Sequence, residues 1–331
     1  MTFPNGSADD PSGQGPAPED GAARRERIIA TRRVTRRADA RLRLTLAAVC
    51  ILGVIAIVVA LVIAEAGRPK TPVQATTPNN TLSGAALATV VAQLTSVPAA
   101  TFNQVGAGSA SAHPDVIGPA GGTPAAPPLT AAGKPDLLYV GAEFCPYCAA
   151  ERWAVITALS RFGTFTGLAS IKSATIDGAG DQEPFPATST WTFRNATFTS
   201  SFVAFTPVEL FTNVPDQQTG GYTTLQKPTA AQQALISKYD APPFVPSQSQ
   251  GAIPFLDYGG KFVSVGASYD PSVLSGLSWA QIATDLHSPA SRVARGVLGA
   301  ANLMTAALCQ LTGGQPATAC TATVRSLESQ L

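Results

Sequence analysis

The chain has 331 residues, a formal net charge of +1 and 13% charged residues. This balance excludes a protein covered by a basic nucleic-acid-binding surface and a protein with an acidic tail. The length allows two domains, but the first third differs in composition from the rest and is not expected to fold. We therefore predict one decorated domain.

Residues 1–43 are predicted to form a disordered, basic cytoplasmic tail. Residues 1–23 are rich in Gly, Pro, Ser and Asp, and nine arginines lie between Arg24 and Arg43. Such a cluster could bind nucleic acid or anionic lipid, but membrane topology is sufficient to explain it, and no nucleic-acid partner is expected. The preference for Arg over Lys indicates a GC-rich bacterial genome.

Residues 44–64 are predicted to be a transmembrane helix. Residues 45–64 carry no charge, and a helix of this length, at about 1.5 Å per residue, spans the roughly 30 Å core of a bilayer. A cleaved signal peptide is the alternative, because Ala64 and Ala66 have suitable spacing, but the apolar run is longer than is usual for one.

The orientation of this helix follows from the charges on either side of it. The arginine cluster precedes the helix, and only Arg68 and Lys70 follow it closely. The positive-inside rule then predicts a single-pass signal-anchor protein of the bacterial cell membrane, with the N-terminus in the cytoplasm and an extracytoplasmic C-terminal domain. The lipid bilayer is therefore an expected partner.

The segment after the anchor begins as a linker and becomes helical. Residues 65–81 are a polar Pro/Thr/Asn tether. Residues 82–97 are predicted to be an amphipathic helix, because their apolar positions recur at helical spacing; these positions are Leu87, Val90, Val91 and Leu94. Residues 106–135 are rich in Gly, Pro and Ala and are predicted to be loop.

A buried strand is predicted at 136–141, and a helix should begin directly after the following Cys-Pro-Tyr-Cys. Pro146 suits the first helical turn, where its missing N–H costs nothing. Apolar residues repeat along one face of this helix; they are Val155, Ile156, Leu159 and Phe162. A further strand is predicted at 168–176.

Two insertions are predicted, at about 177–201 and 213–250. The first contains a Thr/aromatic alternation at 190–193 and 197–199, which we interpret as an inserted β-hairpin bent at 194–196. Between the insertions, 202–211 is predicted to be a strand, although Pro207 argues against an uninterrupted central strand. The second insertion should contain a helix at 229–239.

The end of the domain is predicted to be a hairpin followed by helices. Short strands at 251–258 and 261–265 flank Gly259 and Gly260, which are typical of a hairpin turn. Helices are predicted at 279–286, 291–311 and 319–331, of which residues 291–331 form a C-terminal helical extension.

The cysteines gain meaning from the predicted extracytoplasmic location, which permits stable disulfides. Cys50 lies in the predicted membrane helix, and the other four follow it. Cys145 and Cys148 are separated by two residues and lie far in sequence from Cys309 and Cys320, so local pairing is predicted within each pair.

A CxxC at the start of a helix has the two groups that disulfide exchange needs. The helix N-terminus favours the thiolate of Cys145, and Cys148, one turn further in, can resolve the mixed disulfide. Thiols in such positions have pKa values from about 3.5 to 7, against about 8.5 for a free cysteine. Cys145 is therefore predicted to be the nucleophile and Cys148 the resolving thiol.

Two other interpretations of this CxxC are a zinc site and a static structural disulfide. Zinc would need two more ligands, and His113, His287, Cys309 and Cys320 show no suitable spacing. We expect no metal and no other cofactor. The static disulfide stays open as an alternative, although a strand before the motif and a helix after it favour a redox role.

The sequence from Phe144 to Cys148 resembles the active-site motif of the thioredoxin superfamily, and the segment around Pro254 is similar to its cis-proline segment. The stretch from GAEFCPYC through TWTF and FTPVELF resembles the membrane-anchored DUF929 family. These resemblances imply a thioredoxin-like α/β fold over 82–290, with Cys145 attacking, Cys148 resolving and Pro254 as the cis-proline. They also imply that Ile253, Pro254, Pro146 and Tyr147 contact substrate.

One departure from the thioredoxin pattern concerns proton transfer. Thioredoxin has a buried acid six residues before its first cysteine, and this chain has Tyr139 there. Glu143 and Glu151 are the candidates for proton transfer in its place, although we expect each to be a solvated surface carboxylate. Trp153 could line a substrate groove, but core packing is expected.

Cys309 and Cys320 enclose a turn between two predicted helices, so we expect a structural disulfide. Closing a loop of this size stabilises by about 3 kcal/mol if the gain comes from the entropy of the unfolded chain. A second redox pair that relays electrons to Cys145 is the alternative.

The predicted function is that of a membrane-anchored extracytoplasmic thiol-disulfide oxidoreductase. Its partners would be secreted or membrane client proteins with cysteines and a membrane redox partner. The sequence leaves open whether it oxidises, isomerises or reduces its clients. The alternative is a non-catalytic binding or envelope assembly module with a structural CxxC disulfide, and a glutathione-dependent enzyme is a third possibility.

Overall fold

The computed structural model describes residues 81–331 except 118–125, 178–179 and 217. The predicted basic tail, the membrane helix and nearly all of the linker lie outside the described residues. Within the described part of the chain, no single helix is both long enough and apolar enough to cross a bilayer.

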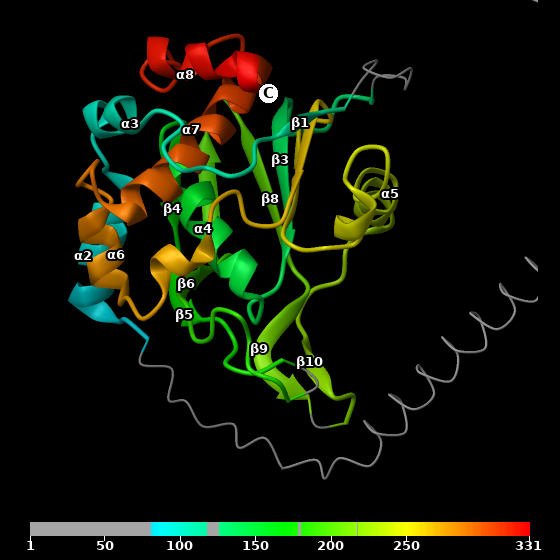
Figure 1. Ribbon diagram of the computed structural model, residues 1–331. Coiled ribbons are helices and arrows are strands. Elements are labelled where there is room, and N and C mark those ends of the chain that lie inside the picture. Colours follow the sequence, from blue (N-terminus) through cyan, green and yellow to red (C-terminus); the bar gives the residue numbers. More distant parts are fainter. Residues whose placement is uncertain (1–80, 118–125, 178–179, 217) are drawn as a thin grey trace, which may run out of the picture. The chain divides into compact units, whose positions relative to one another are not determined.

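The described chain is a mixed α/β structure built on a six-stranded sheet (Figure 1). Its central strand is β3 (Lys134–Gly141), which pairs antiparallel with β11 (Phe255–Tyr258) on one side and parallel with β8 (Ala204–Glu209) on the other. The remaining strands are β12 (Phe262–Val265), which pairs β11, and the two-residue strands β1 (Asp115–Val116) and β2 (Thr130–Ala131).

Side chains alternate between the two faces of this sheet, as a pleated strand requires. On β3, Leu137 and Tyr139 belong to the large core cluster that includes helix α4, whereas Leu138 and Val140 belong to a smaller cluster. Helix α5 (Ala230–Tyr239) covers that second face through Ile236 and other residues. The sheet is therefore sandwiched between helices, with α4 and α7 on one side and α5 on the other (Figure 1).

The larger core is made by helices from both ends of the described chain. Helix α4 (Pro146–Leu159) packs against α7 (Arg292–Leu311), and both are almost wholly buried. Gly299 allows close packing on α7, because a Cβ there would collide with the carbonyl of Ala107. The surrounding helices are α2 (Gly84–Thr95), α3 (Ala99–Val105), α6 (Trp279–Asp285) and α8 (Ala322–Leu327), with short 3₁₀ turns at Ser247–Ser249, Pro271–Leu274 and Glu328–Gln330.

Helix starts carry the side-chain caps that their sequences favour. Thr229 and Gln232 form a capping box at α5, and Ser278 and Gln281 form one at α6. The Ser291 hydroxyl accepts the backbone N–H of Ala294 at the start of α7. These local signals explain why the predicted helices at 229–239, 279–286 and 291–311 are confirmed to within a residue or two at each end.

The hairpin predicted at 190–199 is wrong. β7 (Thr197–Ser200) pairs with β4 (Gly163–Thr166), and β6 (Ser189–Thr192) pairs with β5 (Ala169–Lys172). The two Thr/aromatic segments are therefore successive parts of one side of a longer ribbon, since residue alternation specifies a face but not a pairing partner. Both sides bend together, because Gly167 has a positive φ and lies against the backbone of Asn195.

An inserted hairpin does exist, but it lies at the start of the second predicted insertion. β9 (Phe211–Asp216) pairs antiparallel with β10 (Gly221–Thr224) and projects beyond the main sheet (Figure 1). The hydroxyl of Tyr222 on β10 donates to the carbonyl of Ile176, which ties the hairpin to the loop after β5.

Several predicted strands are confirmed, and Pro207 is accommodated as expected. β3 and the β11–β12 pair occupy the predicted segments. β8 has β3 as its one partner among the described strands, so Pro207 lies on an edge strand, where a missing N–H is tolerated. Helix α3 and strand β4 were not predicted, because α3 has only seven residues and β4 only four.

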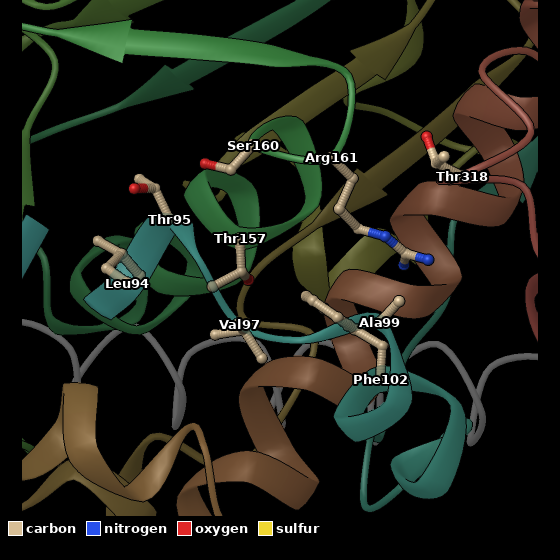
Figure 2. A pocket seen from close by; sticks show the side chains of 9 residues that line it. All are labelled: Leu94, Thr95, Val97, Ala99, Phe102, Thr157, Ser160, Arg161 and Thr318. Atoms are coloured by element: carbon tan, nitrogen blue, oxygen red, sulfur yellow. The ribbon is translucent and has the colours of Figure 1, made fainter. Parts of the chain in front are cut away.

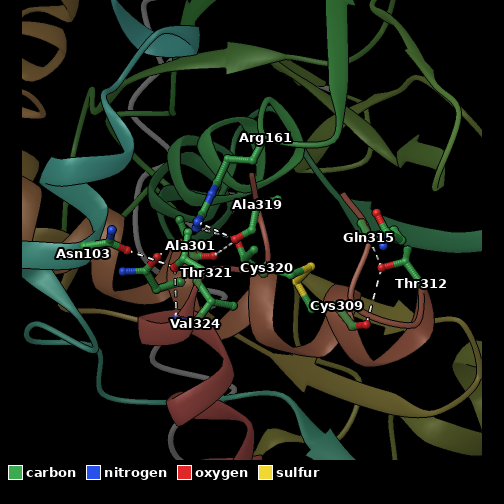
Figure 3. The surroundings of a disulfide bond; sticks show 12 residues. Asn103, Arg161, Ala301, Cys309, Thr312, Gln315, Ala319, Cys320, Thr321 and Val324 are labelled. Carbon is green, nitrogen blue, oxygen red and sulfur yellow. Dashed lines mark hydrogen bonds between the residues drawn. A yellow bond between two sulfur atoms is a disulfide. The ribbon is translucent and has the colours of Figure 1, made fainter. Parts of the chain in front are cut away.

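Cys309 and Cys320 form the predicted disulfide, with Cα atoms 5.7 Å apart (Figure 3). It joins the end of α7 to the segment before α8. The neighbouring carbonyl of Ala319 accepts a hydrogen bond of 2.7 Å from Arg161, and Thr321 donates to Asn103 on α3. The disulfide thus fixes a junction at which three helices meet.

Candidate functional site

The Cys-Pro-Tyr-Cys segment forms the turn between β3 and α4. Cys145 is the N-cap of α4, and its Sγ accepts the backbone N–H of Cys148 at 3.2 Å. Pro146 takes the first helical position, where no N–H is needed. The predicted helix start is therefore confirmed, and the sulfur of Cys145 itself performs the capping role that Ser or Asp commonly has.

The two cysteines are free thiols that differ in exposure. Cys145 retains 4% of its accessible surface and Cys148 retains none. Tyr147 between them is 40% exposed. The turn therefore presents its middle to solvent, with Cys145 at the margin and Cys148 behind it, in the order that the sequence predicts.

Ile253 and Pro254 lie beside Cys145. The peptide bond between them is cis, and the thiol of Cys145 donates to the Ile253 carbonyl at 3.7 Å. This proximity follows from the register of the sheet, because Phe255 pairs with Val140 near the end of β3. The structure thus brings together the predicted site residues Cys145, Cys148, Pro146, Tyr147, Ile253 and Pro254.

Aromatic side chains surround the turn. Phe144 stacks on Tyr222 of β10 with centroids 4.1 Å apart and lies 6.1 Å from Phe211 of β9. Tyr147 meets Phe185 edge to face at 5.7 Å. Such rings give the margin of the turn a large apolar contact area with few rotatable bonds, and the β9–β10 hairpin provides two of them.

A pocket of about 380 Å³ adjoins the cysteine turn. Phe211 and Ile253, which pack against the Cys145 cluster, are also in its wall. Other apolar side chains line it from β3, β11 and α5, namely Val140, Phe255 and Ile236, and the polar lining includes Gln226, Lys227, Gln233 and Asp240. Burial raises the pKa of Asp240 to about 6.

An ion pair that was not predicted lies below the turn. Arg152 and Glu209 are both fully buried, with Nε to Oε1 at 2.9 Å and Nη2 to Oε2 at 2.7 Å. Nη2 also donates to the carbonyl of Ala142 at 2.7 Å. The same carbonyl accepts the backbone N–H of Cys145 at 3.3 Å, so the guanidinium is bonded directly to the cysteine turn.

Tyr139 lies in this buried region at the position where thioredoxin has an acid. Its side chain is fully buried, and its ring centroid is 5.9 Å from the Arg152 guanidinium carbon. Burial raises the pKa of its hydroxyl well above the ordinary value, although Arg152 acts in the opposite direction. The hydroxyl has no hydrogen-bond partner among the described residues, so Tyr139 is a neutral group in place of an acid.

These surroundings make the two thiols chemically unequal. Burial raises the pKa of the Cys145 thiol, but hydrogen bonds from the Cys148 thiol and N–H, together with the charge of Arg152, leave it below the ordinary value. Burial raises the pKa of Cys148 well above the ordinary value, and the Cys145 sulfur raises it further. Cys145 is therefore the sulfur that ionises first.

The two candidate proton-transfer residues are not solvated, contrary to expectation. The Glu143 carboxylate accepts from the Thr192 hydroxyl at 2.6 Å in a buried position. Glu151 is fully buried and accepts from both the N–H and the hydroxyl of Ser268, at 2.8 and 2.6 Å. The prediction was wrong because the whole of α4 is buried by α7 and β6, which the sequence of the helix alone does not reveal.

Burial has a further consequence for Glu151. It raises the pKa of this carboxyl to about 7, although the two hydrogen bonds from Ser268 act in the opposite direction. The carboxylate is bonded to the segment after β12, away from the sulfurs. Trp153 is buried core as predicted, and its indole N–H donates to the Ser189 carbonyl at 2.9 Å.

A second pocket lies at the other end of α4 and is separate from the cysteines (Figure 2). It has a volume of about 200 Å³ and is lined by α2, α3 and the end of α4, with Arg161 at one side. A fourteen-residue helix at about 1.5 Å per residue separates the two ends by roughly 20 Å. This pocket therefore takes no part in the chemistry of Cys145.

The sequence did contain a signal for the missed ion pair. Arg152 lies two turns after Cys145 in an otherwise apolar helix, and Glu209 ends the apolar run of β8. A charged residue within a segment that must be buried requires a partner. Which partner it has depends on the parallel pairing of β8 with β3, and the sequence does not specify this pairing.

The family model described as a domain of unknown function (DUF929) matches residues 125–310, more than half of the chain. This range includes the cysteine turn, the ion pair and Pro254. Searches of curated proteins and of solved structures found no match.

Proposed function

This chain belongs to the DUF929 family, a domain of unknown function, and we propose that it is a thiol-disulfide oxidoreductase that acts on protein clients through Cys145 and Cys148. The observation that carries this proposal is the inequality of the two thiols. One sulfur caps a helix, lies beside a backbone carbonyl at the margin of the turn and has a lowered pKa, and the other is buried one turn further in with a raised pKa.

The exchange needs only these two sulfurs and a client. The Cys145 thiolate attacks one sulfur of a client disulfide, so that a mixed disulfide forms and one client thiolate leaves. Cys148 then loses its proton and attacks Sγ of Cys145, which releases the second client thiolate and forms the Cys145–Cys148 disulfide. Two electrons pass to the client, and the reverse sequence oxidises a client dithiol.

The surroundings of Cys145 support binding of a polypeptide. The carbonyl of Ile253 faces the attacking sulfur and offers a main-chain acceptor to an extended client. Tyr147 and the stacked rings of Phe144 and Tyr222 provide apolar contact. The adjoining pocket of about 380 Å³ is large enough for a bulky client side chain.

A thioredoxin-like fold is part of the same proposal. It is supported by the order of elements around the site: β3, the CxxC turn, α4, the parallel strand β8, and the antiparallel β11–β12 pair led by Pro254. The β4–β7 and β5–β6 ribbon and the β9–β10 hairpin would then be additions to that framework.

We also propose that residues 44–64 anchor this domain in the bacterial cell membrane, with the domain outside. The support is the uncharged run of residues 45–64 and the arginines that precede it. Secreted or membrane proteins with cysteines would then be the clients, and a membrane redox partner would restore the resting state.

Trapping of clients tests the enzymatic proposal. In a Cys148→Ala variant the resolving sulfur is absent, so mixed disulfides between Cys145 and client proteins should accumulate in cells and disappear on reduction. The control is Cys145→Ala/Cys148→Ala, which should trap nothing.

The 4% exposure of Cys145 is the observation that favours the non-catalytic binding module instead. That alternative predicts no covalent adducts in either variant. Absence of adducts from Cys148→Ala, in cells where the protein is folded and membrane-bound, would rule out the exchange activity.

A further inference from the structure

The buried pair of Arg152 and Glu209 is more informative through its position than through its strength. Removing two charges from water costs free energy that offsets much of their attraction, so such a pair adds little net stability. It nevertheless lies directly under the cysteine turn, with both side chains fully buried. Its position therefore calls for a role in the chemistry of the sulfurs.

Arg152 is connected to that turn by a shared acceptor. Its Nη2 and the N–H of Cys145 both donate to the carbonyl of Ala142. Its Nη1 is buried and has no hydrogen-bond partner among the described residues. Part of the guanidinium charge is therefore not taken up by hydrogen bonds and acts on its surroundings through a medium of low dielectric constant.

Glu209 neutralises the arginine incompletely. Its Oε1 also accepts the backbone N–H of Phe193 at 3.3 Å, and its backbone N–H donates to Gln226 at 2.6 Å. The carboxylate is thus held at the end of β8. Arg152, on α4, is bonded both to this carboxylate and to the cysteine turn.

The other ionisable groups near the sulfurs do not substitute for Arg152. Tyr139 on β3 is neutral because burial suppresses its ionisation. Glu143 is bonded to Thr192, and Glu151 to Ser268. Arg152 is the charged side chain that favours the anionic form of both Cys145 and Cys148.

We propose, on the basis of the function proposed above, that Arg152 is a positioning residue that makes the Cys145–Cys148 disulfide an oxidant of client dithiols, and that Glu209 attenuates this effect. A thiol pair whose reduced form is stabilised as a thiolate gives up electrons less readily, so its disulfide accepts them more readily. The fixed charge of Arg152 thus supplies the direction of transfer that the sequence leaves open.

The proposed oxidation transfers two electrons in two steps. A client thiolate attacks Sγ of Cys145, the Cys145–Cys148 bond breaks, and Cys148 leaves and takes up a proton. The second client thiol then loses its proton and attacks the client sulfur of the mixed disulfide, which releases the Cys145 thiolate next to Arg152. The client loses two electrons, the cysteine pair gains them, and a further disulfide compound must reoxidise the pair before the next turnover.

The equilibrium between the full-length protein and glutathione tests the role of Arg152 directly. In Glu209→Gln the arginine keeps a hydrogen-bond acceptor but loses its counter-charge, so the equilibrium should shift several-fold toward the dithiol. In Arg152→Met/Glu209→Gln both charges are absent, and the equilibrium should shift about tenfold toward the disulfide relative to Glu209→Gln, or about 30 mV for this two-electron couple. A merely structural pair would not produce shifts of opposite sign.

Two further variants complete the test. Arg152→Lys keeps the charge and should restore the wild-type equilibrium to within about twofold, a shift below about 10 mV. Arg161→Met removes the arginine at the opposite end of α4 and should leave the equilibrium unchanged, whatever it costs in stability. These variants separate the charge of Arg152 from general effects on folding.

The outcomes separate this inference from the proposed function. Equal equilibrium constants in the wild type, Glu209→Gln and the double variant, or shifts of the same sign in both, would overturn the role of Arg152 even if clients are trapped. The predicted opposite shifts, without any client trapped by Cys148→Ala, would support the electrostatic role and reject the enzymatic function.

Discussion

The two cysteine pairs of the described chain are both buried, yet they have opposite surroundings. Cys309 and Cys320 are 11 residues apart, joined by a disulfide, and placed where α7 meets the segment before α8. Cys145 and Cys148 are free thiols on one helical turn, with Arg152 bonded to the same turn. Burial alone therefore does not separate a structural cysteine from a reactive one; hydrogen bonds and charges at the sulfur do.

The arginine near each pair shows the same contrast. Arg161, beside the disulfide, donates to neutral acceptors on Asn302, Thr305 and Ala319, and burial lowers its pKa to about 10. Arg152 pairs with a carboxylate, which opposes the effect of burial and raises its pKa, so it stays charged. One arginine ties helices together, and the other supplies a fixed positive charge below a sulfur.

The largest expected difference between the pairs is in activity. Cys145→Ser should reduce the rate of insulin-disulfide reduction in the presence of dithiothreitol to the uncatalysed rate, because the attacking sulfur is lost. Cys309→Ala/Cys320→Ala should retain the wild-type rate at a temperature where the protein is folded. Loss of activity in the second variant under those conditions would instead indicate an electron relay between the pairs.

Arg152→Met should cause the largest loss of stability. It leaves Glu209 buried without its cation, and breaking a buried pair in this way costs about 3 to 5 kcal/mol. Urea unfolding at neutral pH measures the change. Arg152→Met/Glu209→Leu should recover most of the loss, and equal stability of the single and double variants would show that Glu209 does not depend on Arg152.

Removal of the disulfide should have a slightly smaller effect. Cys309→Ala/Cys320→Ala is expected to lower the free energy of unfolding by about 3 kcal/mol, because the unfolded chain is no longer constrained. Adding reductant to the wild type should produce the same change. A loss well under about 1 kcal/mol would mean that Arg161 and the α7–α8 contacts hold this junction by themselves.

The smallest effect concerns the pH dependence of stability. The pKa of Glu151 is raised to about 7 in the folded protein, so the folded state retains a proton that the unfolded state has lost. Stability should therefore fall as pH rises from about 4.5 to about 7. Glu151→Gln removes this contribution, and between about pH 5 and 6.5 the wild type should lose about 2 kcal/mol relative to the variant. Parallel pH profiles for the two proteins would place the pKa of Glu151 near its ordinary value.

Much of the secondary structure followed from local signals in the sequence. The Gly-Gly turn identified the β11–β12 pair, and Thr229 and Ser278 identified helix starts, because each of these features depends on neighbouring residues. The cysteine turn and the Cys309–Cys320 pair were recognisable for the same reason. Ile253 and Pro254 could be placed beside Cys145 only through a family resemblance.

The features that sequence reasoning missed all depend on long-range pairing. The partners of β6 and β7 are β5 and β4, which alternation cannot specify. Arg152 finds Glu209 across 57 residues. Glu143 and Glu151 were expected in solvent because their neighbours in sequence do not show which helices and strands will cover them.

The pH dependence of alkylation of each cysteine in the reduced, full-length protein tests the inequality of the two thiols most directly. With iodoacetamide and mass spectrometry of the peptides, we expect Cys145 to react first, with a midpoint below the value of about 8.5 for a free cysteine, while Cys148 stays unmodified over the same range. A midpoint for Cys145 at or above that value, or equal reaction of both sulfurs, would contradict the assignment of Cys145 as the attacking sulfur.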